Sequence, residues 1–329
     1  MSGREELLRE PVRDVLLEDL ADLAPLAGRL VRLYEEMGGF SSRYIAEAFE
    51  VLRSMAVDDC TVFLAFTANL VATGLRGILA SITRTGLVDV IITTGGAIDH
   101  DIARSLGGTY YRGRFEMDDC MLREMNIHRL GNVLVPSESY GPVIESFTHD
   151  LLQDLARIKR RWTPSELLRE VGLRLKDDRG SILAAAASVE IPVFSPGVLD
   201  SAFGTAIFTF NESGRSTGLS VELDLVGDMG KLADIVFESR KLGAIVLGGG
   251  ISKHHVIWWA QFKGGLDYAV YITTAVEFDG SLSGARTREA ISWGKLKASA
   301  QHVTVPADAT VVFPIIALAL YGELSGRPS

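Results

Sequence analysis

The chain has 329 residues, and its 47% apolar content is enough to bury a large core in one α/β domain or in two smaller ones. Its formal net charge of −9 argues against a nucleic-acid backbone as the main ligand and is compatible with cationic partners. Most of the excess acidity lies in residues 1–60, where thirteen aspartates and glutamates face seven arginines.

Cysteine usage and hydropathy bear on the compartment. Cys60 and Cys120 are the only cysteines, there is no CxxC pair and the sequence starts without a secretory leader, so we expect inert thiols in a reducing cytoplasm. The longest uncharged runs, residues 60–75 and 309–322, are shorter than the roughly 20 residues that a membrane-spanning helix needs. The sequence therefore predicts no membrane segment.

The first part of the chain is predicted to be helical. Residues 1–38 have apolar side chains at roughly helical spacing, which favours one or two polar helices that Pro25 interrupts. We find no short-period repeat and no convincing linker further on. We therefore expect an N-terminal helical extension, residues 1–58, followed by a single core domain, residues 59–329.

A second helix of this extension is the clearest amphipathic one in the chain. Ser41 or Ser42 is expected to cap it after the Gly38-Gly39 pair. Its apolar positions follow the i, i+3, i+4, i+7 pattern and are Ile45, Ala48, Phe49, Leu52, Met55 and Ala56.

The core repeats a pattern of apolar strand, small-residue loop and helix. The strands that we expect are Thr61–Phe66, Val88–Thr93, Ala244–Leu247, Leu266–Ile272 and Val303–Val305, with shorter ones at Val133–Val135 and Val193–Phe194. The helices that we expect cover residues 69–83, residues 99–106, a segment through Trp258 and Trp259, and a final apolar segment. This alternation predicts an α/β fold with a doubly wound, mostly parallel sheet of Rossmann-like type.

The middle of the chain carries one strong helix start. Thr163-Pro164-Ser165-Glu166 combines a threonine cap, a proline in the first helical position and a glutamate at the third. A helix is therefore predicted to begin at Pro164.

Small residues follow four of the predicted strands. They are Thr93-Thr94-Gly95-Gly96, Gly248-Gly249-Gly250, Thr274-Ala275 and Asp308-Ala309. Each cluster by itself is typical of a tight turn, and none is a GxGxxG fingerprint. Four of them on one carboxyl edge favour a ligand, because backbone N–H groups and helix N-termini there receive a pyrophosphate. The pattern predicts an NAD site, with Asp200 or Asp308 suited to a ribose hydroxyl.

The segment from Thr273 to Lys297 is where we expect the chemistry. A helix over residues 285–293 would place Glu289 and Trp293 on one face, and Gly294 at its C′ position would let Lys295 project past the end. An acid, an indole and an amine would then converge. Solvated surface charges and a core tryptophan fit the same pattern, which does not separate the two interpretations.

The histidine pair that follows the glycine triplet suggests a proton acceptor. Adjacent residues on a helix point about 100° apart, and no other ligand accompanies His254 and His255 at metal-binding spacing. We therefore predict no metal site and expect one neutral imidazole to act as a base.

The motifs from Gly248 to Pro314 resemble those of the deoxyhypusine synthase family, archaeal forms in particular. GGGISKHH, TTAVEFDGSLSGA, EAISWGK and ADATVVFP occur in that order and spacing, and the similarity extends back over Thr61 to Pro142. The resemblance implies that NAD oxidises spermidine, that Lys295 captures the aminobutyl group as an imine, and that His254 is the catalytic histidine, with His255 structural. The group then passes to a lysine of the hypusine-containing translation initiation factor.

The resemblance also implies which residues hold the ligands. The cofactor positions are Ala68, Asn69, Thr94, Gly95, Gly96, Asp200, Gly248, Gly249, Thr274, Ala275, Asp308 and Ala309. The substrate positions are Asp99, His100, Gly280, Ser281, Leu282, Glu289 and Trp293. Thr205 and Leu282 replace two acids of the eukaryotic pattern, and His100 replaces a glutamate, so the way in which the polyamine is held differs here.

Alternative functions and the assembly state are the remaining expectations. A homospermidine-synthase activity would use the same lysine-bound group with a small diamine as acceptor, and a non-catalytic NAD-binding interaction protein would lack the chemistry. The family resemblance implies a homotetramer with active sites at a dimer interface. We expect no nucleic-acid partner.

Overall fold

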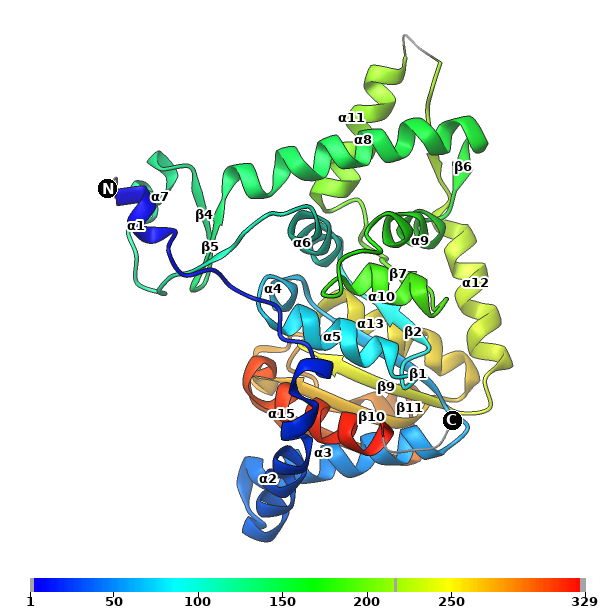
Figure 1. Cartoon of the computed structure of the whole chain (residues 1–329). Helices are drawn as coiled ribbons and strands as arrows, with labels where there is room; N and C mark the ends of the chain where they lie inside the picture. Colours follow the sequence, from blue (N-terminus) through cyan, green and yellow to red (C-terminus); the bar gives the residue numbers. More distant parts are fainter. Residues whose placement is uncertain (1–2, 216–217, 326–329) are drawn as a thin grey trace.

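The centre of the computed structural model, which describes residues 3–215 and 218–325, is a sheet of six parallel strands (Figure 1). Its order is β7 (Val193–Phe194), β2 (Val90–Ile92), β1 (Thr61–Phe66), β9 (Leu242–Leu247), β10 (Leu266–Thr273) and β11 (Leu296–Pro306). Numbered along the chain, this is the 3-2-1-4-5-6 order of doubly wound dinucleotide-binding sheets. The predicted fold class is confirmed.

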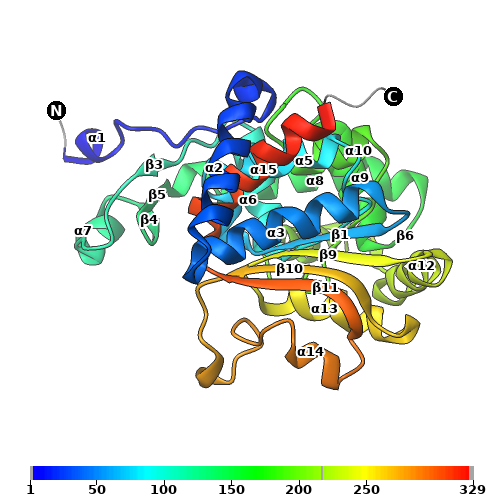
Figure 2. The same ribbon diagram turned by 90° about the horizontal axis from the view of Figure 1, so that it is seen from below.

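The strands form because their near-continuous apolar runs are buried on both faces. In β1, Val62 and Leu64 face one core, and Phe63 and Ala65 face the other. Helices α2, α3, α5 and α15 lie over the first face and α13 over the second (Figure 2). Because every strand is followed by a helix on one face or the other, the carboxyl ends of the strands share one edge with several helix N-termini.

The helices of the N-terminal half are α1 (Gly3–Leu7), α2 (Ala24–Met37), α3 (Phe40–Val57), α4 (Ala68–Val71), α5 (Leu75–Arg84), α6 (Gly95–Ser105), α7 (Asp119–Glu124) and α8 (Gly141–Ile158). Those of the C-terminal half are α9 (Pro164–Arg174), α10 (Ile182–Ser188), α11 (Ala202–Gly214), α12 (Leu225–Glu238), α13 (Gly250–Ala260), α14 (Glu289–Ser292) and α15 (Ala309–Ser325). Short 3₁₀ turns occupy Glu18–Leu23, Ser137–Ser139, Gln261–Lys263 and Glu277–Asp279. No described helix is long and apolar enough to cross a membrane.

Two small sheets complete the described chain. The antiparallel one has the order β3 (Tyr111–Arg112), β5 (Val133–Pro136) and β4 (Ile127–Leu130), and with α1 and α7 it projects from the body of the molecule (Figure 1). The other pairs β6 (Arg161–Trp162) with β8 (Glu222–Leu223). The predicted strands at Val133–Val135 and Val193–Phe194 are thus confirmed.

The N-terminal helices differ from the prediction. Residues 8–17 form no helix. Pro25 lies in the first turn of α2, which begins at Ala24, so the proline does not interrupt this helix. The amphipathic helix starts at Phe40, and its N-cap is Gly39, so neither predicted serine caps it. Ser42 Oγ instead donates to the carbonyl of Gly39 at 2.6 Å. The apolar face of this helix is buried in the main core, as predicted.

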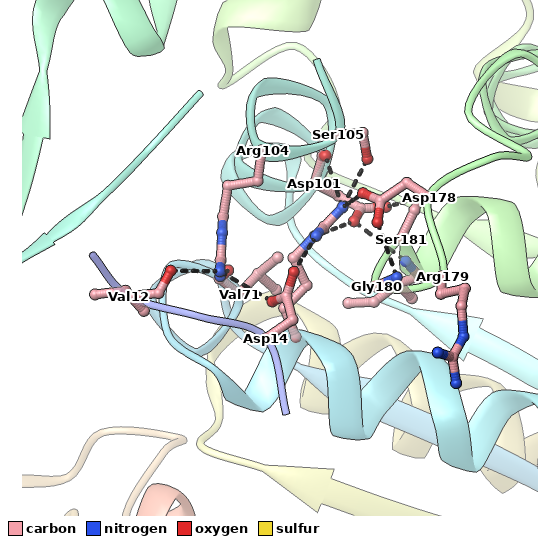
Figure 3. A network of polar contacts seen from close by, with 12 residues as sticks. Val12, Asp14, Val71, Asp101, Arg104, Ser105, Asp178, Arg179, Gly180 and Ser181 are labelled. Atoms are coloured by element: carbon pink, nitrogen blue, oxygen red, sulfur yellow. Dashed lines mark hydrogen bonds and ion pairs between the residues drawn. The ribbon is translucent and has the colours of Figure 1, made fainter. Parts of the chain in front are cut away.

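The non-helical segment 8–17 is fixed by distant partners, which explains why the predicted helix does not form there. The N–H of Val12 donates to the Tyr110 carbonyl at 2.8 Å, and the N–H of Val15 donates to the Gly74 carbonyl at 3.0 Å. Asp14 contacts Arg76 at 2.6 Å and Arg104 at 3.0 Å in a largely buried network (Figure 3). Tertiary hydrogen bonds and ion pairs thus satisfy a backbone whose apolar spacing also suits a helix.

Two further helix predictions have opposite outcomes. The segment 69–83 is not one helix, because the chain turns between α4 and α5. The start at Thr163 is confirmed: its Oγ1 accepts from the N–H of Glu166 at 3.2 Å, and the Glu166 carboxylate accepts from the N–H of Thr163 at 2.9 Å.

Candidate functional site

A cavity of about 920 Å³ lies at the carboxyl edge of the central sheet. Five of the predicted cofactor residues line it together, namely Asn69, Gly248, Thr274, Asp308 and Ala309. They come from the ends of β1, β9, β10 and β11 or from the helices that follow. A cavity of this volume belongs to the upper range of small-molecule sites. The structure therefore brings residues that are far apart in the sequence to one ligand-sized space.

Other predicted cofactor residues lie around the N-terminus of α6. Thr94 caps this helix in an extended conformation, and a Cβ added to Gly96 would lie 3.0 Å from the Cβ of Ala68. A Cβ on Gly95 would lie 2.6 Å from the Cβ of Ser201, next to Asp200. Glycines here let α6 approach its neighbours and leave its first N–H groups open toward the sheet edge.

The residues present fit a dinucleotide. Thr94 Oγ1 is buried and has no hydrogen-bond partner among the described residues, which leaves its hydrogen-bonding capacity unused within the chain. The N-termini of α6, α13 and α15 point toward this edge, where a pyrophosphate would be favoured. Gly249 and Ala275 do not line the cavity. The N–H of Ala275 donates to Thr273 Oγ1 at 3.1 Å, and Gly249 lies against Ser283.

The predicted nucleophile, Lys295, is fixed by the end of α14. Gly294 has a φ of +67°, and its N–H donates to the Ile291 carbonyl at 3.0 Å. The N–H of Lys295 donates to the Ala290 carbonyl at 2.9 Å. These two bonds form a Schellman motif, which requires a left-handed residue where the glycine stands. The predicted C′ glycine is confirmed.

The helix that carries this motif is much shorter than predicted. Residues 285 and 286 are irregular, residues 287 and 288 form a turn, and α14 comprises only Glu289–Ser292. The N–H of Thr287 donates to Thr304 Oγ1 on β11 at 3.1 Å. Bonds from this segment to its surroundings replace the intrahelical bonds that a longer helix would make.

Two tryptophans enclose the amine of Lys295. Its Nζ lies 5.1 Å from the ring centroid of Trp293 and 5.8 Å from that of Trp258. The residue is 8% exposed, and no carboxylate of the described residues forms an ion pair with it. Each indole face attracts a cation and excludes water. The amine is therefore shielded without being neutralised by an acid.

His254 is next to this amine. Its ring stacks on Trp258 with centroids 5.8 Å apart and an angle of 24°. Burial first, and then the positive charge of Lys295, lower the pKa of His254 below its ordinary value. Burial lowers the pKa of His255 to about 4, and its ring packs edge-on against Trp259. Both imidazoles are thus neutral at neutral pH, and His254 is the one beside the amine.

Asp99 and His100 lie in the interior and away from any open surface. Asp99 is 1% exposed, and its carboxylate accepts from the N–H groups of Ala202 and Phe203 and from the Tyr140 hydroxyl at 2.8 to 2.9 Å. His100 Nδ1 lies 2.8 Å from the Tyr110 hydroxyl. The structure therefore gives these two predicted substrate residues a role in joining α6 to α8, α11 and the segment before β3.

The buried His100 predicts an acid-sensitive fold. Burial lowers its pKa to about 4, well below the value of about 6.5 in an unfolded chain, so the unfolded state binds the proton more readily. We expect the free energy of unfolding to fall by up to roughly 3 kcal/mol per such histidine as the pH drops from about 6.5 to 4. Urea unfolding of wild type and His100→Phe across this range tests it. An unchanged slope in the variant would contradict the assignment.

The remaining predicted substrate residues form a loop beside α13. Gly280 has a φ of +73°, and the N–H of Ser281 donates to Asp279 at 2.7 Å. Leu282 contributes its carbonyl to Lys253, and Glu289 is exposed at the start of α14. This loop lies between the glycines that follow β9 and the segment that leads to Lys295.

Sequence reasoning missed several residues of the cavity and of the lysine site. Thr67 and Thr273 line the cavity and directly follow or end a strand, so the small-residue signal applied to them as well. Glu10, Arg112 and Phe115 also line it, and no local pattern indicates them. The sequence pattern places Trp258 only in an expected helix, and it predicts no role for Lys253.

Fold and cavity together define a doubly wound α/β protein with a ligand-sized cavity at the carboxyl edge of its sheet and a shielded lysine. The family model for deoxyhypusine synthase matches residues 29–320. The chain is 49% identical to a "probable deoxyhypusine synthase" of Sulfurisphaera tokodaii over 97% of this chain and 99% of that protein. It is 52% identical to an Ignicoccus hospitalis protein of the same name over 95% and 96%. The chain belongs to the deoxyhypusine synthase family.

A solved structure agrees with this assignment. The crystal structure of a candidate deoxyhypusine synthase from Entamoeba histolytica superposes with a TM-score of 0.59 at 25% identity, covering 86% of this chain and 89% of that one. The fold is therefore shared along nearly the whole length of both chains.

Proposed function

We propose that this chain transfers the aminobutyl group of spermidine, with NAD, to a lysine of the translation initiation factor that carries hypusine. The observation that supports this most is the amine of Lys295, held between Trp258 and Trp293 beside the neutral His254. A nucleophilic lysine needs such a place, because a carboxylate partner would hold the amine protonated.

In this proposal His254 of α13 transfers the proton, and Lys295, just after α14, forms and breaks the covalent bonds. When bound, NAD accepts a hydride from the substrate carbon and later returns it. His254 takes the proton from the substrate nitrogen, so that an imine forms. The Lys295 nitrogen then adds to the imine carbon, and the bond to 1,3-diaminopropane breaks as that amine leaves with a proton. The acceptor lysine displaces Lys295 in the same way, and the returned hydride yields a stable secondary amine.

Two groups of residues would hold NAD. Asn69, Gly248, Thr274, Asp308 and Ala309 line the cavity, and Thr94, Gly95 and Gly96 present the N-terminus of α6. The orphaned hydroxyl of Thr94 is the most specific of these features, because it has no partner among the described residues. Titration of NAD against wild type and Thr94→Val tests this placement, since loss of one hydrogen bond should weaken affinity roughly tenfold.

The acceptor is the least constrained part of the proposal. Incubation with NAD and labelled spermidine, with either the initiation factor or a small diamine added, separates the alternatives by mass. Label on the factor supports deoxyhypusine synthase, and label on the diamine alone supports the homospermidine reaction. If no NAD-dependent 1,3-diaminopropane is released, the chain is an NAD-binding protein without this chemistry.

We also propose that each active site is completed by a second subunit, in a tetramer built from dimers. None of Lys295, His254, Trp258 and Trp293 lines the cavity of the same chain. Trp258 is 43% exposed and Trp293 67% exposed, which is high for indoles and leaves an apolar face to cover. A closed symmetric dimer would present both the cavity and the lysine face twice.

Mixing two inactive variants tests this assembly. Lys295→Ala lacks the nucleophile, and Asn69→Trp fills the cavity from an exposed position of α4. If the cavity and the lysine face of one active site come from different chains, subunit exchange should restore about a quarter of the wild-type activity. Half of the dimers are then mixed, and one of the two active sites in each mixed dimer is intact. A mixture that stays inactive after proven exchange, or a fully active monomer, would refute the proposal.

A further inference from the structure

Lys253, in the first turns of α13, is a buried lysine without an acidic partner. It is 1% exposed, and it forms no ion pair with any residue in the described ranges. Lysines are almost never fully buried unless they are paired. Its ammonium instead donates to the Leu282 carbonyl at 2.8 Å and to the Ala285 carbonyl at 2.5 Å. The ring of Tyr271 lies beneath it at 4.5 Å.

The two carbonyls belong to the loop that leads to the proposed nucleophile. Ser283, between them, accepts from the N–H of Gly250 at 3.1 Å, and its carbonyl accepts from Thr273 Oγ1 at 3.3 Å. A Cβ on Gly249 would lie 2.5 Å from the Ser283 Cα, so only glycine allows this approach. The loop is therefore bound to α13 and to the end of β10 at several points, of which Lys253 is the charged one.

We propose that Lys253 is a positioning residue that latches the loop of residues 280–285 onto α13, so that His254 and Lys295 keep a fixed relation. His254 follows Lys253 directly in α13, and the loop continues into α14 and its Schellman motif. One ammonium thus joins the element that carries the base to the element that carries the amine. The inference rests on the proposed function of those two residues.

A role as a second nucleophile does not fit Lys253. Its nitrogen is enclosed and already donates to two carbonyls, whereas Lys295 lies beside partly exposed indoles. Burial lowers the pKa of Lys253 to about 8, so the group is still mostly charged at neutral pH. A charged donor strengthens both hydrogen bonds.

Hydrogen exchange of the loop tests the latch without reference to activity. Lys253→Met keeps an unbranched side chain that is one atom shorter and removes both hydrogen bonds of the ammonium. We expect exchange in peptides covering residues 280–286 to accelerate by roughly 10-fold or more, the effect of losing hydrogen bonds to a charged group. Lys263→Met is the matched control, because Lys263 follows the same helix and donates to the Phe237 carbonyl at the surface. It should leave the loop unchanged.

Activity distinguishes positioning from simple packing. We expect Lys253→Met to lower kcat for spermidine oxidation by roughly 10-fold or more while NAD affinity is unchanged, and Lys253→Arg, which retains donors, to keep more of kcat than the methionine variant. A packing role predicts the reverse order, because arginine is the larger misfit. If residues 280–286 of Lys253→Met exchange hydrogen at the same rate as in wild type, the proposed latch is wrong.

A second variant covers the case in which Lys253→Met does not fold. Ser283→Ala removes only the hydroxyl that accepts from Gly250 and should loosen the same loop by a smaller factor. An unchanged loop in Ser283→Ala would then count against the latch. A wild-type protein that releases no 1,3-diaminopropane would refute the proposed function, while the exchange comparison would still decide the latch.

Discussion

Replacing Lys295 by arginine is expected to abolish aminobutyl transfer, by roughly 10³-fold or more, while NAD binding is retained. The guanidinium keeps the positive charge and its contact with the two indoles, but it stays protonated and cannot form an imine. The charge and shape at this position are therefore nearly conserved, so a loss of aminobutyl transfer reports the loss of the nucleophilic amine. Transfer is measured as labelled aminobutyl on the acceptor protein.

The covalent step can be observed directly. Wild-type protein incubated with NAD and spermidine and then reduced with borohydride should gain one aminobutyl group on Lys295. Lys297→Arg is the matched control, because Lys297 lies two residues further on and pairs with Asp267 at 2.7 Å. It should trap the group as wild type does. If no mass appears on Lys295 in wild type, the imine mechanism is wrong.

The central sheet was predictable because its strands carry their own signal. β9 is buried at every position and β10 at all but one. Short apolar runs of this kind, bounded by glycines, predict buried strands. With helices between parallel strands, right-handed crossovers then place helices on both faces of the sheet, as observed. The N-terminal segment was not predictable, since Val12 and Val15 find their backbone partners in Tyr110 and Gly74, far along the chain.

The candidate site was predictable to the extent that it depends on strand ends. Asn69, Gly248 and Asp308 each follow a different strand, and parallel topology brings such positions to one edge. The place of Trp293 beside Lys295 was predicted from their spacing, but that of Trp258 was not, because it depends on how α13 packs near the end of α14. The same holds for the latch, in which a helix residue bonds to carbonyls about thirty positions further on.

The interior position of Asp99 and His100 shows what a motif leaves undecided. Both follow the Gly95-Gly96 pair in α6, and an acid in that place is equally suited to a ligand amine and to the N-terminus of α11. In this chain its oxygens accept from the backbone of Ala202 and Phe203. A role of Asp99 toward a polyamine stays a prediction, as does that of Glu289, which is exposed at the start of α14.

Removing the imidazole of His254 should slow spermidine oxidation by roughly 10² to 10⁴, the usual contribution of a positioned base. His255→Ala is the matched control: its ring packs against Trp259, so the loss should reduce stability more than the oxidation rate. His254 must be neutral to accept a proton, and its pKa is lowered below 6.5. The fall of kcat on the acidic side of the pH profile, the acid limb, should therefore lie below pH 6.5. Trp258→Ala exposes the imidazole to water, which raises its pKa and should move that limb to higher pH. Cofactor reduction in a single turnover, followed from pH 5 to 9, measures all three variants. Equal losses for His254→Ala and His255→Ala, or an acid limb that does not move in Trp258→Ala, would remove His254 from this role.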